Sequence, residues 1–339
     1  MGEFELIARY FTRPTPNAVL GVGDDCALLQ PGPGMQMAIS TDLLVEGRHF
    51  FADVDPRSLG HKALAVNLSD LAACGARPLA FTLALALPKA DPAWLEPFSQ
   101  GLLALADAHG CELIGGDTTQ GPLAICITVF GEVPTGGFGR GGARPTQALL
   151  RSGAQAGDDV WVSGTLGDAH LALQALQGRI DLPADLLARA RQRLERPTPR
   201  VALGLALRGI ASAAADISDG LLGDLGHILA RSGVGATVHT DIATNLIAEN
   251  AYSTRASGQF DHMPLAQMAL QCVLAGGDDY ELVFTARPAQ RAVVQAASAA
   301  SATPVTRIGQ IDAEPGLRLV DALGQPVANT YHSFNHFSA

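Results

Sequence analysis

The amino-acid sequence predicts a mixed α/β (α+β) protein with two domains. At 339 residues, 47% of them hydrophobic, the chain is long enough for about two cores. Aromatic residues make up only 5%, while small and aliphatic residues are plentiful, which suits an α/β protein. Segments with helical periodicity alternate with apolar runs of strand length, and this alternation indicates the same class.

Composition and charge exclude several functions. The formal net charge is -10 and the only lysines are Lys62 and Lys89, so the chain offers no basic tract to a nucleic-acid backbone. The five cysteines are scattered and form no C-x-x-C pair, as expected of a protein in a reducing cytoplasm. The N-terminus is acidic and the apolar runs are far shorter than the roughly 20 residues that span a bilayer, so we expect no targeting segment and no membrane anchor.

The first predicted element is a helix over residues 3–11, which the following prolines end. Its apolar side chains share one face: Phe4, Ile7, Ala8 and Phe11. The next segment, residues 21–27, places two glycines and two adjacent aspartates before a short apolar run that we expect to form a strand. Adjacent carboxylates repel each other, so either a cation lies beside them or the segment is a solvated Gly-Asp turn.

A strand over residues 35–40 is expected to end in Ser40-Thr41-Asp42, and α/β enzymes often place their chemistry at strand ends. The next histidine, His49, stands alone, and a lone histidine is typical of a surface as well as of a functional site.

The segment 56–74 predicts a helix whose apolar stripe contains Asp70. Burying an unpaired carboxylate costs several kcal/mol, so Asp70 is neutral, paired or facing a metal. Asn67, one turn earlier, would serve as its partner or as a second polar ligand.

Further strands are expected at 79–87 and 122–133, with a helix at 92–109. A short strand at 112–114 leads into the Gly-Gly-Asp-Thr-Thr segment 115–119. Its glycines allow a phosphate to approach the backbone, and its acid can bind the accompanying cation. A linker rich in glycine and arginine follows at 136–145; it formally contains G-x-G-x-x-G, but no periodic helix follows, so we discount it.

The second half repeats the combination of glycine and acid. We expect a strand at 159–162, a helix at 168–177 and two helical segments around 196–199. A strand that ends in Asp216-Ile-Ser-Asp-Gly220 leads into a helix that buries Leu221, Leu225, Ile228 and Leu229, and an irregular loop follows at 244–262. The segment Gly276-Gly-Asp-Asp-Tyr-Glu281 then precedes a strand at 282–286, and a helix, two strands and a tail complete the chain.

At least six such aspartate motifs are spread over both halves, while the histidine and cysteine spacing of a zinc site is missing. Oxygen ligands favour Mg²⁺ or Mn²⁺, and several acids together indicate several ions around a polyphosphate. No P-loop motif occurs. The residues therefore indicate a Mg²⁺-dependent phosphoryl transferase, or an ATP-using ligase, that lacks a Walker motif.

These motifs, in this order, closely resemble those of the thiamine-monophosphate kinase family, and the likeness covers nearly the whole chain. The resemblance implies a two-domain cyclo-ligase-like fold: residues 1–135 as an N-terminal ATP- and Mg²⁺-binding α/β domain that forms a homodimer through its sheet, 136–147 as a linker, and 148–339 as a C-terminal α/β domain that completes the active site. It further implies phosphorylation of thiamine monophosphate by ATP to thiamine diphosphate in the cytoplasm.

The resemblance also implies roles for individual residues. The implied Mg²⁺ ligands are Asp25, Ser40, Thr41, Asp42, Asp70, Asp117, Asp216 and Asp219. The implied nucleotide contacts are Gly116, Asp117, Arg151 and Ser218, and the implied contacts to thiamine monophosphate are His49, Asp278 and Phe334. Two of these depart from the family pattern, since Asp278 stands where glutamate is usual and Phe334 where tyrosine is usual.

The implied mechanism is in-line transfer, in which metal ions offset the repulsion between two phosphates. The acceptor is a phosphate oxygen that is largely ionised near pH 7, so we assign no general base. Two other classes remain open on the sequence alone. One is another ATP-using relative within the superfamily, whether cyclo-ligase-like, selenophosphate-synthetase-like or of the hydrogenase-maturation type. The other is a scaffold that binds nucleotide without turnover.

Overall fold

The computed structural model describes residues 2–136, 146–247 and 265–334. The chain forms two compact units. Unit 1 comprises Met1–Leu71 and Ala76–Ala148, and unit 2 comprises Ala72–Gly75 and Leu149–Ala339. In the described ranges, no helix is both long and apolar enough to cross a membrane.

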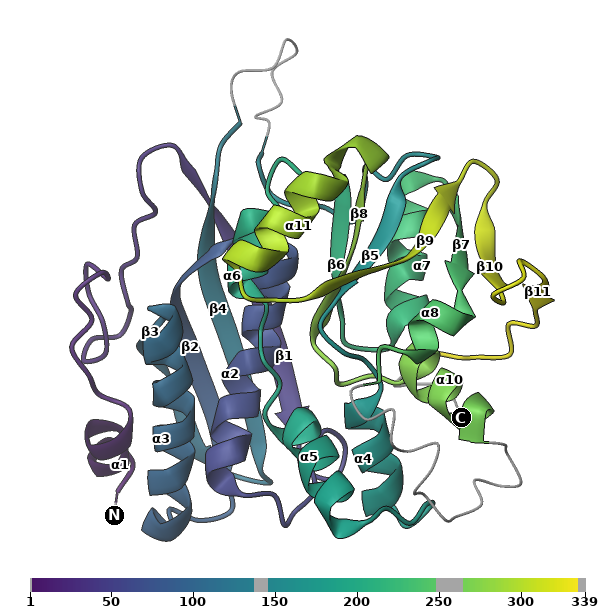
Figure 1. Ribbon diagram of the computed structural model, residues 1–339. Coiled ribbons are helices and arrows are strands. Elements are labelled where there is room, and N and C mark those ends of the chain that lie inside the picture. The colour runs from purple at the N-terminus through teal and green to yellow at the C-terminus, as the bar shows by residue number, and fades with distance from the viewer. Residues whose placement is uncertain (1, 137–145, 248–264, 335–339) are drawn as a thin grey trace. The chain divides into compact units, whose positions relative to one another are not determined.

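Unit 1 is built on a four-stranded sheet of order β1-β4-β2-β3, in which only β2 and β3 run parallel. Its elements are α1 (Glu3–Tyr10), β1 (Met35–Val45), α2 (Pro56–Ala73), β2 (Arg77–Leu87), α3 (Pro92–His109), β3 (Glu112–Gln120) and β4 (Ala124–Pro134). Helices α2 and α3 lie side by side (Figure 1), because Gly60 and Gly101 allow close approach: a Cβ on Gly60 would lie 2.1 Å from the carbonyl oxygen of Phe98.

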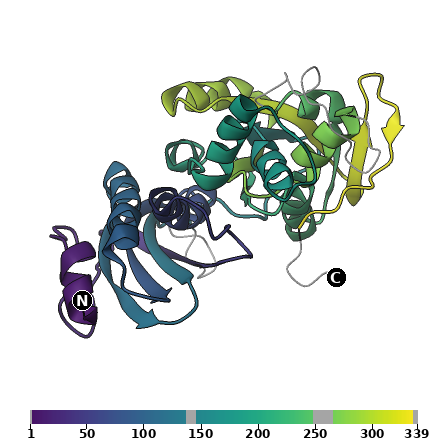
Figure 2. The ribbon, with the colours of Figure 1, turned by 90° about the horizontal axis from the view of Figure 1, so that it is seen from below.

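The other face of this sheet is exposed along part of β1, whereas Ala80 and Ile114 are buried and pack against Ala18, Ala27 and Leu29. Along β1 the side chains alternate, and Ile39 and Leu43 are 62% and 53% exposed. Figure 2 shows α3 on one side of the strands of unit 1. The exposed face is therefore the one turned away from the helices.

The predicted helices of unit 1 are confirmed, but three strand predictions are wrong. Both β1 and β3 are longer than expected, so Asp42 and Asp117 lie inside strands rather than at or just beyond their ends. Backbone pairing with β4 and β2 continues through these polar residues. The strand expected after residue 26 does not form; Leu28 makes only an isolated bridge with Leu20, since the apolar run is three residues long and prolines follow.

Unit 2 contains a seven-stranded sheet of order β11-β10-β7-β9-β5-β8-β6, in which only β7 and β10 run parallel. Its strands are β5 (Asp159–Ser163), β6 (Ala213–Ile217), β7 (Gly235–His239), β8 (Glu281–Ala286), β9 (Val305–Asp312), β10 (Gly316–Val320) and β11 (Pro326–Val327). Its helices are α4 (Asp168–Leu176), α5 (Ala184–Glu195), α6 (Val201–Ala206), α7 (Leu221–Ser232), α8 (Thr240–Thr244), α10 (Leu265–Ala275) and α11 (Arg291–Ala300), with a 3₁₀ turn, η1, at Pro288–Gln290. Strands β5, β6 and β8 are buried along their whole length, which requires cover on both faces.

Most elements expected in unit 2 are present, and the predicted buried side of α7 is confirmed: Leu221, Leu225 and Ile228 are fully buried. Three elements of unit 2 were not predicted, namely β7, α8 and α10. The loop expected at 244–262 begins inside α8, with Leu246 and Ile247 buried, and its residues from 248 lie outside the described part, as do residues 137–145 of the expected linker.

Candidate functional site

The first candidate cluster of unit 1 lies where β1 meets α2. The hydroxyl of Ser40 donates a hydrogen bond to Asp70 Oδ2, so of the three states open to Asp70 the paired one is observed. The backbone amide of Asp42 donates to Asn67 Oδ1 at 3.1 Å, and the other end of the Asn67 amide donates to the carbonyl of Ala63 at 3.0 Å. Asn67 is buried, and its amide fixes the backbone at Asp42; the sequence had suggested it as the partner of Asp70 or as a second polar ligand.

Thr41 belongs to the opposite, exposed face of β1. Its hydroxyl lies 2.9 Å from that of Thr128 on β4. Its side chain therefore points away from Ser40 and Asp42, since successive strand residues alternate between faces. As a Mg²⁺ ligand beside Ser40 and Asp42, Thr41 would act through its backbone atoms.

A pocket of about 580 Å³ forms the second candidate region of unit 1. Asp25, Gly116 and Asp117 line it together, which brings three predicted site residues to one cavity. Apolar side chains of α1, Phe4 and Ile7 among them, line the same pocket. A cavity with carboxylates beside an apolar wall suits a ligand that has both a charged and an apolar part.

Asp42 and Asp117 are not brought together within the sheet of unit 1. Two strands separate β1 from β3, which corresponds to roughly 14 Å at the usual strand spacing. His49 lies in the turn after β1, where its Nδ1 accepts a hydrogen bond from the amide of Val45 at 3.0 Å. That bond makes His49 Nδ1 the acceptor and leaves the proton of a neutral ring on Nε2.

In unit 2 the candidate residues gather on the turn after β6. The buried carboxylate of Asp224 accepts three hydrogen bonds, each 3.1 Å long, from the amides of Ser218, Asp219 and Gly220. Burial raises the pKa of Asp224 to about 7, against the lowering effect of the amides. Asp224 therefore fixes the turn that carries Ser218, a predicted nucleotide contact, and Asp219, a predicted Mg²⁺ ligand.

The loop at 276–280 and the C-terminal segment are bonded to this same turn. The amide of Asp278 donates to the carbonyl of Ser218 at 2.9 Å, and the amide of Phe334 donates to the carbonyl of Asp219 at 3.0 Å. Asp216, the next-to-last residue of β6, is buried just before the turn. Predicted metal, nucleotide and substrate residues are thus neighbours within unit 2.

Arg151 is the one predicted residue of unit 2 that no described contact joins to this cluster. Its neighbour Leu150 accepts a hydrogen bond from the amide of Ala214, near the start of β6, whereas Ser218 follows the end of that strand. Arg151 itself is exposed.

Asp224 was missed by the sequence reasoning, although a signal existed. It stands between Leu221 and Leu225 in an apolar stripe, the same pattern that singled out Asp70. An acid inside a buried stripe needs partners, and for Asp224 these are backbone amides, which leave no trace in side-chain spacing.

The donor set suits Mg²⁺ by its chemistry. The candidates offer carboxylate, hydroxyl and backbone oxygens, which hard divalent cations prefer. No group of three or more His, Cys, Asp or Glu side chains in the described ranges is arranged to hold a metal ion. Mg²⁺ typically takes one or two carboxylates together with substrate phosphates and waters, so pairs of acids meet its requirement once a phosphate is bound.

Comparison with known proteins identifies the domains that form this architecture. Residues 23–133 match the AIR synthase related protein N-terminal domain, and residues 155–322 match the corresponding C-terminal domain. Fold and site therefore define a two-domain protein of the AIR synthase related class. The thiamine-monophosphate kinase of Salmonella typhimurium (strain LT2) is 45% identical over 99% of this chain and 98% of its own. The chain belongs to the thiamine-monophosphate kinase family.

Two solved structures agree with this assignment. The thiamine-monophosphate kinase from Stenotrophomonas maltophilia K279a matches with a TM-score of 0.77 and 46% identity, over 93% of this chain and 94% of that one. The structure of AaThiL complexed with AMPPCP and TMP matches with a TM-score of 0.72 and 26% identity, over 91% and 89%. The predicted fold class and family are thereby confirmed.

Proposed function

We propose that this protein transfers the terminal phosphoryl group of ATP to thiamine monophosphate, giving thiamine diphosphate and ADP. The observation that carries the proposal is the convergence in unit 2, where backbone hydrogen bonds join the Ser218–Asp219 turn to Asp278 and to Phe334. The similar thiamine-monophosphate kinases match 99% of the chain, which supports the same reaction.

The proposed contacts to ATP are Gly116, Asp117, Arg151 and Ser218. Of these, Gly116 and Asp117 line the pocket of unit 1. The proposed Mg²⁺ ligands are Asp25, Ser40, Thr41, Asp42, Asp70, Asp117, Asp216 and Asp219. Bound Mg²⁺ would supply charge neutralisation between the phosphates.

The protein's own groups orient the reactants. His49, Asp278 and Phe334 are proposed to contact thiamine monophosphate. The carboxylate of Asp278 is complementary to the cationic thiazolium, and the ring of Phe334, 47% exposed, is available for stacking on a cationic heterocycle. The attacking phosphate oxygen is already ionised near neutral pH, so no side chain is assigned as a base.

We also propose a cytoplasmic homodimer formed through the exposed sheet face of unit 1. Ile39 and Leu43 leave large apolar side chains on that face, and such a surface is typical of an interface. The five cysteines are free thiols, as expected of a reducing compartment. Ile39→Glu combined with Leu43→Glu should convert a dimer to a monomer in light scattering; a dimer that persists would contradict this interface.

The reaction is tested with purified protein, ATP, Mg²⁺ and thiamine monophosphate, by following thiamine diphosphate and ADP by chromatography. Stoichiometric formation of both products is expected. ADP with no thiamine diphosphate would indicate a different substrate within the superfamily. Bound ATP without any ADP would indicate a nucleotide-binding scaffold.

A further inference from the structure

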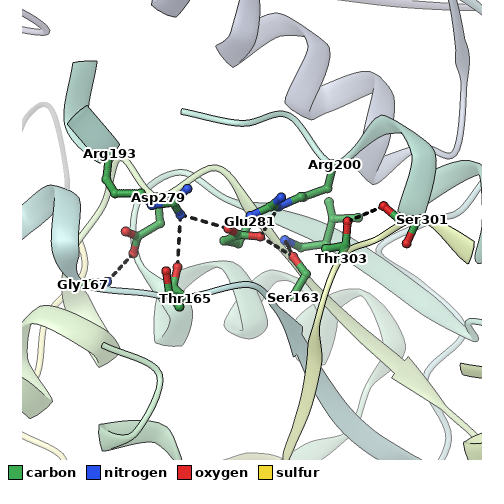
Figure 3. A network of polar contacts seen from close by, with 10 residues as sticks. Ser163, Thr165, Gly167, Arg193, Arg200, Asp279, Glu281, Ser301 and Thr303 are labelled. Carbon is green, nitrogen blue, oxygen red and sulfur yellow. Dashed lines mark hydrogen bonds and ion pairs between the residues drawn. The ribbon is translucent and has the colours of Figure 1, made fainter. Parts of the chain in front are cut away.

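Figure 3 shows a buried polar cluster of unit 2 that the proposed function does not use. Its centre is Glu281, the first residue of β8, which is completely buried and directly follows the loop 276–280 that carries Asp278. Glu281 accepts hydrogen bonds from Ser163 at 2.6 Å, from Arg193 at 2.9 Å and from Arg200 Nε at 2.6 Å. We call these four residues the Glu281 cluster.

The Glu281 cluster ties the start of β8 to distant parts of unit 2. Arg193 comes from α5, Arg200 from the segment before α6, and Ser163 from the end of β5. The hydroxyl of Ser163 also accepts a hydrogen bond from the amide of Leu282 at 2.8 Å. Two guanidinium groups on one buried carboxylate fix its position far more tightly than a single pair would.

Asp279, two residues earlier, is a second buried acid. It is 1% exposed, and its Oδ2 accepts a hydrogen bond from the amide of Gly167 at 2.9 Å. Its Oδ1 has no hydrogen-bond partner among the described residues. Burial raises the pKa of Asp279 well above its usual value, although the Gly167 amide and Arg193 act in the opposite direction.

The backbone on both sides of Asp279 is strained. Asp278 has φ +69° and Tyr280 has φ +52°, in the left-handed region that residues with a Cβ rarely adopt. Such a conformation persists only where contacts with the surrounding structure hold the backbone in it. Here the amide of Tyr280 donates to the carbonyl of Ile217 at 2.9 Å, and the preceding Gly277 has no room for a Cβ, which would lie 2.5 Å from the carbonyl oxygen of Ser218.

We propose that Asp279, supported by the Glu281 cluster, is a positioning residue that holds the strained loop 276–280 and so aims Asp278 at the thiamine part of the acceptor substrate. The proposal rests on the proposed role of Asp278. Asp279 is not proposed to touch substrate, because its side chain is buried and accepts a hydrogen bond from the amide of Gly167. Losing this acceptor would release the strain of both neighbours and let Asp278 relax away from its position.

The test compares Asp279→Ala with Asp279→Asn in the full-length protein. Asparagine keeps a side-chain oxygen that can accept from the Gly167 amide, whereas alanine does not. For Asp279→Ala we expect the KM for thiamine monophosphate to rise at least tenfold, with the KM for ATP within twofold of the parent. Asp279→Asn should restore the KM for thiamine monophosphate to within threefold of the parent.

Amide hydrogen exchange gives a readout that does not depend on turnover. In Asp279→Ala the amides of Asp278 and Tyr280 should exchange at least tenfold faster than in the parent, while amides in the middle of β8 keep their protection. Arg200→Lys keeps the charge but loses the planar guanidinium, and it should accelerate exchange at the same two amides by a smaller factor. This second variant replaces Asp279→Ala in the test if that protein fails to fold.

Two results would overturn the proposal: unchanged exchange of both amides in folded Asp279→Ala or Arg200→Lys, or equal increases in KM for both substrates. A parent protein that forms no thiamine diphosphate refutes the proposed function instead, and the exchange experiment then still decides whether Asp279 holds the loop.

Discussion

The close approach of β3 to β2 at Gly116 gives the sharpest test of how unit 1 positions its acids. Gly116 has φ +147°, and a Cβ there would lie 1.8 Å from the carbonyl oxygen of Leu83. Adding that Cβ in Gly116→Ala would impose backbone strain of roughly 1–3 kcal/mol. Relieving the overlap by moving the backbone adds about 1–3 kcal/mol more.

The neighbouring glycine provides a matched control. A Cβ on Gly115 would meet nothing closer than 3.9 Å, at the Thr82 methyl group, which is an ordinary contact. For a unit of this size, roughly 2–6 kcal/mol corresponds to a fall in Tm of about 5–20 °C for Gly116→Ala. Gly115→Ala should change Tm by only a degree or two.

The same displacement should reach the ligand pocket, because Gly116 and Asp117 both line it. A shift of about 1 Å in a positioning group can cost on the order of 100-fold in kcat/KM, so we expect a loss of this order for ATP in Gly116→Ala. The measurements are thermal unfolding and steady-state kinetics with varied ATP. If the Gly116→Ala and Gly115→Ala proteins matched in Tm and in kcat/KM, the reasoning from the close approach would be refuted.

Three further predictions concern the acids. Asp42→Ala and Asp117→Ala should each lower kcat by at least about 100-fold with little change in Tm, and near-normal turnover in either protein would contradict their proposed role as metal ligands. Asp224→Ala leaves three amides without their acceptor and should cost roughly 2–4 kcal/mol in urea unfolding, whereas an unchanged midpoint would show that the turn holds without it. Because the pKa of Asp279 is raised above 3.8 in the folded state, ionisation favours unfolding as the pH rises above that value. The Tm of Asp279→Asn relative to the parent should therefore increase from pH 5 to pH 8, and a constant difference would contradict a buried neutral acid.

Periodicity predicted the helices of unit 1 and most of those of unit 2, but not α8 or α10. It predicted the ends of β1 and β3 poorly. Strand pairing depends on backbone hydrogen bonds, which continue through Ser40, Asp42 and Asp117 as readily as through apolar residues. A strand end inferred from the last apolar residue is therefore too early wherever a partner strand runs on.

Among the candidate-site residues, too, those marked by a local sequence pattern were predicted and those fixed by remote backbone contacts were not. Asp70 was singled out by its place in an apolar stripe, and this partly buried acid accepts a hydrogen bond from Ser40. Asp279 has no comparable signal, because its partner is the backbone amide of Gly167, 112 residues away in the sequence. Contacts between a side chain and a remote backbone depend on the fold as a whole, and no local pattern encodes them.

The two units position their acids by different physical means, and this difference decides how perturbations will spread. In unit 1 Asp42 lies on β1, which pairs with β4, and Asp117 lies on β3, which pairs with β2. Displacing either residue therefore means displacing a stretch of the sheet. In unit 2 Asp219 and Asp278 stand on turns, each held by a buried acid that accepts backbone amides. Removing one such acceptor frees a few residues while the seven-stranded sheet stays paired. Disturbing β3 should therefore lower activity and Tm together, whereas releasing a turn of unit 2 should, besides any cost in stability, raise amide exchange locally at that turn.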